Sequence, residues 1–126
     1  MRIGIDAVEV ARFKALSLRR GERFLARLFT VEELRYARTA RGDRMYERLA
    51  ARFAVKEALC KAIGGRLPFR SIEIAHLEAG GPLSVACSCV RETITASLTH
   101  TRRLAVAVVL LGVDDTAGCT ATGEAE

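Results

Sequence analysis

The sequence contains the stretch RFAVKEALCK at residues 52–61, inside the strongest helical pattern of the chain, residues 44–63. Apolar residues recur along this pattern at helical spacing. They would form one side of the helix: Leu49, Phe53, Ala54, Leu59, Cys60 and Ile63. Gly64 and Gly65 follow directly, and glycine commonly ends helices because it adopts the left-handed backbone conformation without steric cost. The stretch therefore predicts one long helix that ends near Ile63.

The segments around this helix predict an α+β domain. We expect strands over residues 2–8, 71–77, 83–87, 93–98 and 104–111, helices over 9–16, 19–29 and 30–38, and a Gly-Gly-Pro turn at 80–82. Thr30 and Glu33 form a capping-box pattern at the start of the third of these helices. Because helices come early and strands late, residues 1–111 are predicted to form one α+β domain. Residues 112–126 are rich in Gly, Ala, Thr and acidic residues, and we expect a disordered tail.

The composition limits the class of protein without choosing a function. The chain has 126 residues, half of them hydrophobic, which is enough for a single core. The net charge of +5 favours an anionic partner: nucleic acid, an anionic membrane, a phosphorylated cofactor or an acidic protein. The longest apolar run, residues 104–113, is far too short to cross a bilayer. The four cysteines lack a C-x-x-C pair and the chain opens directly into a strand pattern, so we expect a cytoplasmic protein without a zinc site.

Two carboxylates could form a metal site if the fold brings them together. Asp6 lies at the end of the first strand, on the face opposite Ile3 and Ile5, and Glu57 lies in the middle of the long helix. Mg²⁺ typically takes one or two such carboxylates and completes its shell with water and substrate phosphate. Lys61, one turn after Glu57, would place a positive charge near a phosphate. The same residues also fit a surface Glu57–Lys61 pair worth about 0.2–0.5 kcal/mol and a helix cap at Asp6, and spacing does not decide between these interpretations.

Hydroxyl and basic side chains offer two further candidate sites. Residues 97–101, SLTHT, precede the last strand, so Ser97 and His100 could hold a phosphate or simply form a polar turn. The first two helical segments carry six basic residues: Arg12, Lys14, Arg19, Arg20, Arg23 and Arg27. This surface fits either an acidic partner or an ordinary solvated helix face.

Three segments, in this order, resemble the holo-acyl-carrier-protein synthase family of small 4′-phosphopantetheinyl transferases. They are GIDAVEV at residues 4–10, RFAVKEA at 52–58 with Lys61 and AIG at 62–64, and SLTH at 97–100 followed by AVAV at 105–108. The resemblance covers roughly residues 1–111. It implies helices packed on a small, mainly antiparallel sheet, in a homotrimer whose active sites are shared between neighbouring subunits. It also implies Mg²⁺-dependent transfer of 4′-phosphopantetheine from coenzyme A to a serine of an acidic apo acyl carrier protein, with release of adenosine 3′,5′-bisphosphate.

The resemblance assigns roles to individual residues. Asp6 and Glu57 would bind Mg²⁺, and Glu57 and Lys61 would take part in catalysis, with the general base left open. Coenzyme A would be bound by Arg52, Lys61, Gly64, Ser97 and His100. The carrier protein would dock on Arg12, Arg19, Arg20 and Arg23. We expect neither nucleic acid nor a membrane as a partner.

Two other interpretations stay open at this point, and so do the details of the substrate. The chain could be a non-catalytic basic module that binds nucleic acid, although its aromatic residues are not interleaved with basic ones as stacking on single strands would require. It could also be a degenerate relative that only stabilises an assembly, because residues 82–97 are shorter than usual in the family and lack room for a helix. The sequence does not identify the carrier, which could serve fatty-acid or polyketide synthesis, and it leaves acyl-coenzyme A tolerance open.

Overall fold

A computed structural model of the chain describes residues 1–76 and 83–112. The described strands are β1 (Arg2–Glu9), β2 (Ile72–His76), β3 (Leu83–Cys87), β4 (Thr93–His100) and β5 (Leu104–Gly112). The described helices are α1 (Val10–Arg20), α2 (Glu22–Leu28), α3 (Val31–Arg38) and α4 (Arg44–Ile63), with a short 3₁₀ helix η1 (Phe69–Ser71). The predicted α+β class is confirmed. None of these helices is both long and apolar enough to cross a bilayer.

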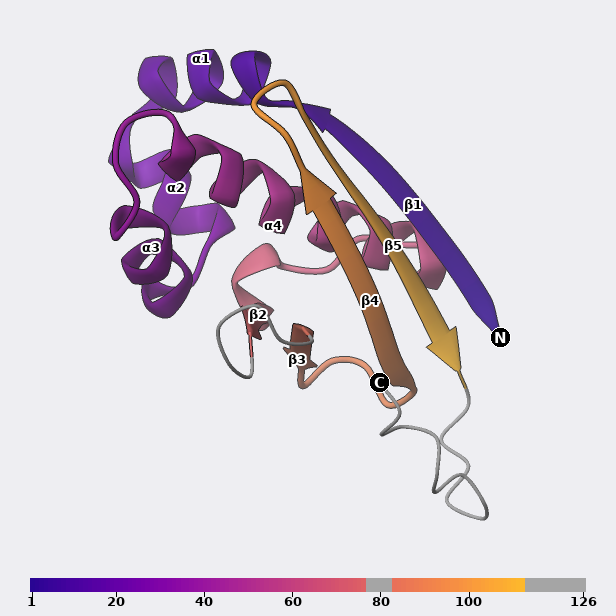
Figure 1. Ribbon diagram of the computed structural model, residues 1–126. Helices are drawn as coiled ribbons and strands as arrows, with labels where there is room; N and C mark the ends of the chain where they lie inside the picture. Colours follow the sequence, from indigo (N-terminus) through magenta and orange to yellow (C-terminus); the bar gives the residue numbers. More distant parts are fainter. Residues whose placement is uncertain (77–82, 113–126) are drawn as a thin grey trace.

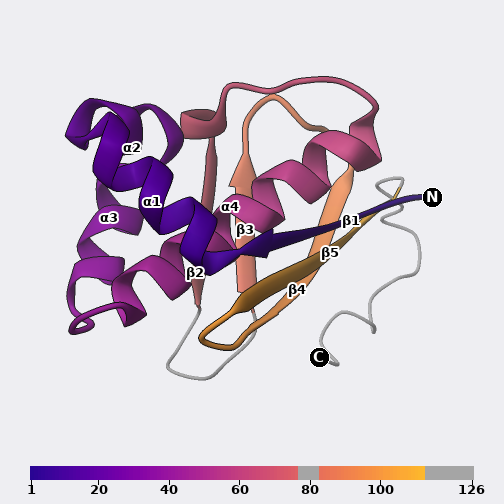
Figure 2. The same cartoon turned by 90° about the horizontal axis from the view of Figure 1, so that it is seen from above.

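The strands form two antiparallel sheets beside the long helix. Three strands pair in the order β1-β5-β4, and β2 pairs with β3. Helix α4 packs against β1, β4 and β5, while α1, α2 and α3 gather at one end of it (Figures 1 and 2). One core cluster joins the second half of α4 to β2 and β5, and a second joins its first half to α1, α2 and α3. The long helix is therefore the common support of both halves of the domain.

A glycine in β1 lets this strand lie directly on α4. A Cβ built on Gly4 would lie only 2.0 Å from the carbonyl oxygen of Ala58, a distance that real Cβ contacts do not reach. Small residues on α4, Ala58 and Ala62, face this glycine. Since side chains alternate along a strand, Asp6 lies on the same face as Gly4 and also points toward α4. The close approach at Gly4 thus carries Asp6 to the surface of the long helix.

A fully buried ion pair fixes the other side of α4. Lys56 Nζ lies 2.7 Å from Glu33 Oε1 and also donates to the carbonyl oxygens of Leu28 and Phe69, at 2.8 and 2.9 Å. Burial lowers the pKa of Lys56, while the charge of Glu33 opposes that effect. Because Lys56 is held inside the domain, the next residue along the helix, Glu57, is turned toward the β1 side.

Most predicted elements are confirmed, and the boundaries show where sequence patterns were insufficient. The capping box of Thr30 and Glu33 is present, and α4 ends at a left-handed Gly64 with a φ of 82°. Helix α1 runs to Arg20 and α2 starts after Gly21, whereas the patterns predicted a break before Arg19. Strand β4 runs to His100, so the hydroxyl-rich segment is a strand and not a turn, and β5 includes Gly112, which the patterns placed in the tail.

The predicted lack of a helix between β3 and β4 is confirmed, because the residues that link these strands are described and contain none. The predicted turn at residues 80–82 and the tail over 113–126 lie outside the described residues.

Candidate active site

The structure brings Asp6 and Glu57 to one cavity. The cavity has a volume of about 560 Å³ and is lined by β1, α1 and α4: Asp6, Ala7, Val8, Glu9, Arg12, Phe13, Ala15, Leu16, Arg19, Phe53 and Glu57. The side chains of Asp6 and Glu57 are only 16% and 22% exposed. Two partly buried carboxylates at one cavity are costly without nearby cations, which makes this arrangement a candidate for a cation or phosphate site.

Each carboxylate has a cationic partner. Lys61 Nζ lies 3.0 Å from Asp6 Oδ1 and 3.0 Å from the carbonyl oxygen of Ile5. Arg66 Nη1 lies 3.1 Å from Glu57 Oε1. Lys61 therefore reaches across to β1 instead of pairing with Glu57 one turn away, so the simple surface Glu57–Lys61 pair is not formed.

The donor set fits a hard divalent cation. Two carboxylates provide anionic oxygen ligands and leave the other coordination positions open for water or phosphate, which is the arrangement that Mg²⁺ favours. Within residues 1–76 and 83–112, no group of three or more His, Cys, Asp or Glu side chains could hold a metal. Asp6 and Glu57 are thus a pair of carboxylates at one cavity, the set that the sequence predicts as Mg²⁺ ligands.

The other residues predicted to bind coenzyme A lie away from this cavity in the subunit. Arg52 is buried, its guanidinium 4.5 Å from the ring centroid of Tyr36, and burial lowers its pKa. His100 Nδ1 lies 3.2 Å from Glu47 Oε1, and Ser97 lies on the exposed outer face of β4. Gly64 caps α4. Among the described residues, only Lys61 of this predicted set contacts one of the cavity carboxylates.

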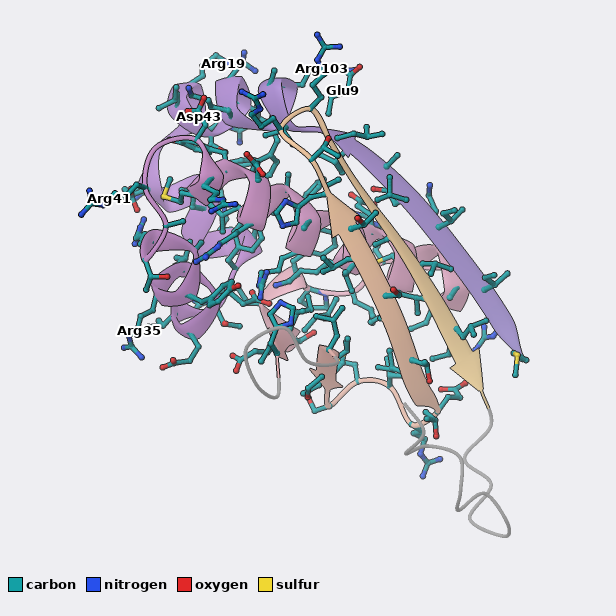
Figure 3. The ribbon with its side chains drawn as sticks, in the orientation of Figure 1. Glu9, Arg19, Arg35, Arg41, Asp43 and Arg103 are labelled. Atoms are coloured by element: carbon teal, nitrogen blue, oxygen red, sulfur yellow. The ribbon has the colours of Figure 1, made fainter. Side chains whose placement is uncertain are left out.

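The predicted docking arginines divide between the cavity and its surroundings. Arg12 and Arg19 line it, and Figure 3 shows Arg19 and Glu9 at the same end of the molecule, on α1 and at the end of β1. Arg20 lies over the ring of Phe24, with its guanidinium carbon 5.2 Å from the centroid, and Arg23 is exposed on α2. A basic rim thus continues from the cavity onto the first two helices.

Sequence reasoning missed Arg66. The sequence assigns Gly64 to the helix end and to coenzyme A binding and gives Arg66 no role, yet a tight turn after a helix also returns the chain along it. That return is what places residue 66 beside residue 57. The apolar wall was missed as well, because Phe13 and Phe53 belong to different helices and meet only in the fold, with ring centroids 5.4 Å apart.

Comparison with known proteins shows the family and the fold. Residues 2–109 match the model of the 4′-phosphopantetheinyl transferase superfamily. The holo-[acyl-carrier-protein] synthase of Oceanobacillus iheyensis is 38% identical over 112 residues, covering 86% of this chain and 93% of that protein. The synthase of Carboxydothermus hydrogenoformans is 40% identical over 122 residues, covering 88% and 97%. The structure of the Bacillus anthracis synthase in complex with CoA (3′,5′-ADP) superposes with a TM-score of 0.80 at 31% identity, covering 90% of this chain and 96% of that chain.

The fold and these matches define a phosphopantetheinyl transferase. The chain belongs to the 4′-phosphopantetheinyl transferase superfamily, over nearly the whole of its described part. The family predicted from the three sequence segments is confirmed, and so is the predicted enzyme class, holo-[acyl-carrier-protein] synthase.

Proposed function

We propose that this protein transfers 4′-phosphopantetheine from coenzyme A to a serine of an apo acyl carrier protein in a Mg²⁺-dependent reaction. The observation that carries the proposal is the meeting of Asp6 and Glu57 at one cavity, with Lys61 bonded to Asp6. The similar proteins named above are holo-[acyl-carrier-protein] synthases, and the Bacillus anthracis one is in complex with CoA (3′,5′-ADP). The cytoplasmic location expected from the sequence stays a prediction.

The residues of the cavity account for the chemistry of this transfer. Asp6 and Glu57 would hold Mg²⁺, which when bound supplies charge neutralisation at the diphosphate of coenzyme A. The carrier serine oxygen forms a bond to the β-phosphorus, the bond from that phosphorus to the bridging oxygen breaks, and adenosine 3′,5′-bisphosphate leaves with the bond's electron pair. Lys61 would bind the diphosphate with its ammonium group. The serine proton passes to a base: Glu57 lines the cavity and can accept it, whereas Lys61 can accept it only as a neutral amine and not while it binds the diphosphate as an ammonium.

The basic rim supports docking of an acidic carrier. Arg12 and Arg19 line the cavity, and Arg20 and Arg23 are exposed on α1 and α2, so a carrier bound to these arginines would present its serine to the diphosphate. Attraction between opposite charges mainly speeds encounter and sets orientation. The arginines of the rim would bind the carrier, and only the carrier's serine would take part in the bond-forming step.

The outer face of the three-stranded sheet supports a homotrimer. Ile3 and Ile5 are 63% and 61% exposed, and they pair across the sheet with Leu110 and Val108 of β5. An apolar sheet face of this kind normally packs against another element or another subunit. Ser97 lies on the same face, opposite Val108, so a subunit packed there would meet it. This placement is what we would expect if Ser97 contributes to a site shared with a neighbour.

One experiment tests the proposed activity directly. Protein, coenzyme A, Mg²⁺ and an apo acyl carrier protein are incubated, and the carrier is weighed by mass spectrometry for the added phosphopantetheine arm. We expect Glu57→Gln to reduce transfer by at least about 100-fold and EDTA to abolish it. Glu32→Gln, which removes an exposed carboxylate of α3, is the matched control and should leave the rate unchanged. No mass change with the unaltered protein, or full activity in Glu57→Gln, would refute the proposal.

A further inference from the structure

The guanidinium of Arg66 is hydrogen-bonded to the carboxylate of Glu57 in this structure. Arg66 Nη1 lies 3.1 Å from Glu57 Oε1, and the hydrogen bond, followed by the charge of Glu57, raises the pKa of Arg66. The contact follows the turn after α4, where Gly64 adopts a φ of 82°, and it brings the side chain of residue 66 beside that of residue 57. Arg66 therefore places a positive charge at one of the two predicted metal ligands.

The two cations at the carboxylates are held differently. Lys61 belongs to α4 and donates to two acceptors on β1, the carbonyl of Ile5 and the carboxylate of Asp6. In the described part of the chain, Arg66 donates one hydrogen bond, to Glu57, and its side chain is 71% exposed on a loop. Its guanidinium carbon also lies 5.5 Å from the centroid of the Phe69 ring. Arg66 can thus leave Glu57 by a rotation of its side chain, with water replacing the lost hydrogen bond.

Arg66 is bonded to one oxygen, Oε1, of the carboxylate that would bind the divalent cation. A metal that binds Glu57 must either displace the guanidinium or accept a like charge a few ångströms away. At such distances the repulsion between exposed charges corresponds to roughly a three- to tenfold change in affinity. Occupation of Glu57 by Arg66 thus lowers the affinity for metal without changing the ligands themselves.

We propose that Arg66 is a counter-ion of Glu57 that competes with the divalent cation and so sets the metal affinity of this site. The inference rests on the proposed function, since it takes Asp6 and Glu57 as the metal ligands. Arg66 acts through Glu57 and is a positioning residue. In the absence of metal it keeps the carboxylate neutralised and oriented, and on metal binding its guanidinium is released toward solvent.

The test measures metal binding without substrate, so it does not depend on turnover. Mn²⁺ is titrated into the purified protein without coenzyme A, and free Mn²⁺ is followed by electron paramagnetic resonance. We expect Arg66→Gln to lower the Kd for Mn²⁺ roughly three- to tenfold. Arg66→Lys, which keeps the charge, should stay within about twofold of the unaltered protein. Arg70→Gln removes another exposed arginine close in sequence and should also stay within about twofold.

The outcomes separate this inference from the proposed function. Glu57→Gln should weaken Mn²⁺ binding at least about tenfold, and if it does not, the metal site itself is wrong. If Glu57→Gln weakens binding but Arg66→Gln leaves the Kd unchanged or raises it, the competition by Arg66 is refuted while the metal site stands. Tightening by Arg66→Lys or Arg70→Gln as large as that by Arg66→Gln would also overturn the inference, because the local charge would then not be the cause.

Discussion

Replacing Gly4 by alanine should separate β1 from α4. The added Cβ would lie 2.0 Å from the carbonyl oxygen of Ala58 and 2.9 Å from the backbone nitrogen of Ala62. Both are helix backbone atoms, which cannot rotate away as a side chain can. Ordinary van der Waals contact begins at 3.4 Å, so strand and helix must move apart by roughly 1.4 Å at this point.

The separation of β1 from α4 should lower both the unfolding free energy and the transfer rate. Forcing one extra methyl group into a closely packed contact costs about 1–3 kcal/mol of unfolding free energy. Asp6 lies two residues along the same face, so it should recede from Glu57 and Lys61. A displacement of about 1 Å in a reacting arrangement can reduce a rate by roughly 100-fold, so transfer should fall by about 10- to 100-fold in protein that is still folded.

Urea unfolding and the carrier mass assay measure the two effects. Gly112→Ala is the matched control, because it adds a Cβ at a glycine of the same sheet where, chain neighbours aside, no atom of the described residues lies within 4 Å, and it should change stability by less than about 0.5 kcal/mol. If Gly4→Ala keeps both the unfolding free energy and the transfer rate of the unaltered protein, the close strand–helix contact does not position Asp6 as described.

Three further changes test other parts of the structure. Lys56→Met should lower the unfolding free energy, measured by urea unfolding, by about 3–5 kcal/mol, because it leaves Glu33 buried without its cation. A double variant with Glu33→Gln should recover part of this loss, and an additive loss from the two changes would contradict the pairing. Arg19→Glu with Arg23→Glu should raise the KM for the carrier about tenfold or more at low salt with little effect on kcat. The same charge change at Arg35 and Arg41, which lie away from Arg19 (Figure 3), should leave this KM unchanged, and equal effects from both pairs would exclude a specific docking surface. Ile5→Lys should dissociate the proposed trimer in sedimentation velocity experiments, while Val31→Lys, at a similarly exposed apolar residue of α3, should leave it intact. A trimer that survives Ile5→Lys would show that the outer sheet face is not the interface.

Sequence patterns predicted the elements well because each carries its own signal. The long helix was bounded correctly, since its apolar repeat ends at a glycine that adopts the left-handed conformation. The capping box was also recognisable, because Thr30 and Glu33 satisfy each other within one turn. The break between α1 and α2 was misplaced, because basic residues continue across Gly21 and no apolar pattern marks the change of direction.

The site was only partly predictable because its contacts are long-range. The positions of Asp6 and Glu57 in the sequence make them a candidate pair, and the family resemblance assigns their role, while the reason they meet, the missing Cβ of Gly4 against α4, appears only in the packing. Lys61 was expected near phosphate, but its bond to Asp6 joins residues 55 positions apart and no local pattern indicates it. The sequence does not distinguish Lys56, adjacent to Glu57, from a surface lysine, since a lysine in a helix is usually exposed and only the fold shows it to be fully buried.

The central claim is that Asp6 and Glu57 bind one divalent cation at the transfer site. Anomalous diffraction from crystals grown with Mn²⁺ and coenzyme A would locate the metal directly. We predict one strong peak within about 2.0–2.4 Å of an oxygen of each carboxylate, bridged to the diphosphate. A peak bound to neither carboxylate, or diphosphate bound with Asp6 and Glu57 still paired to Lys61 and Arg66, would contradict the mechanism.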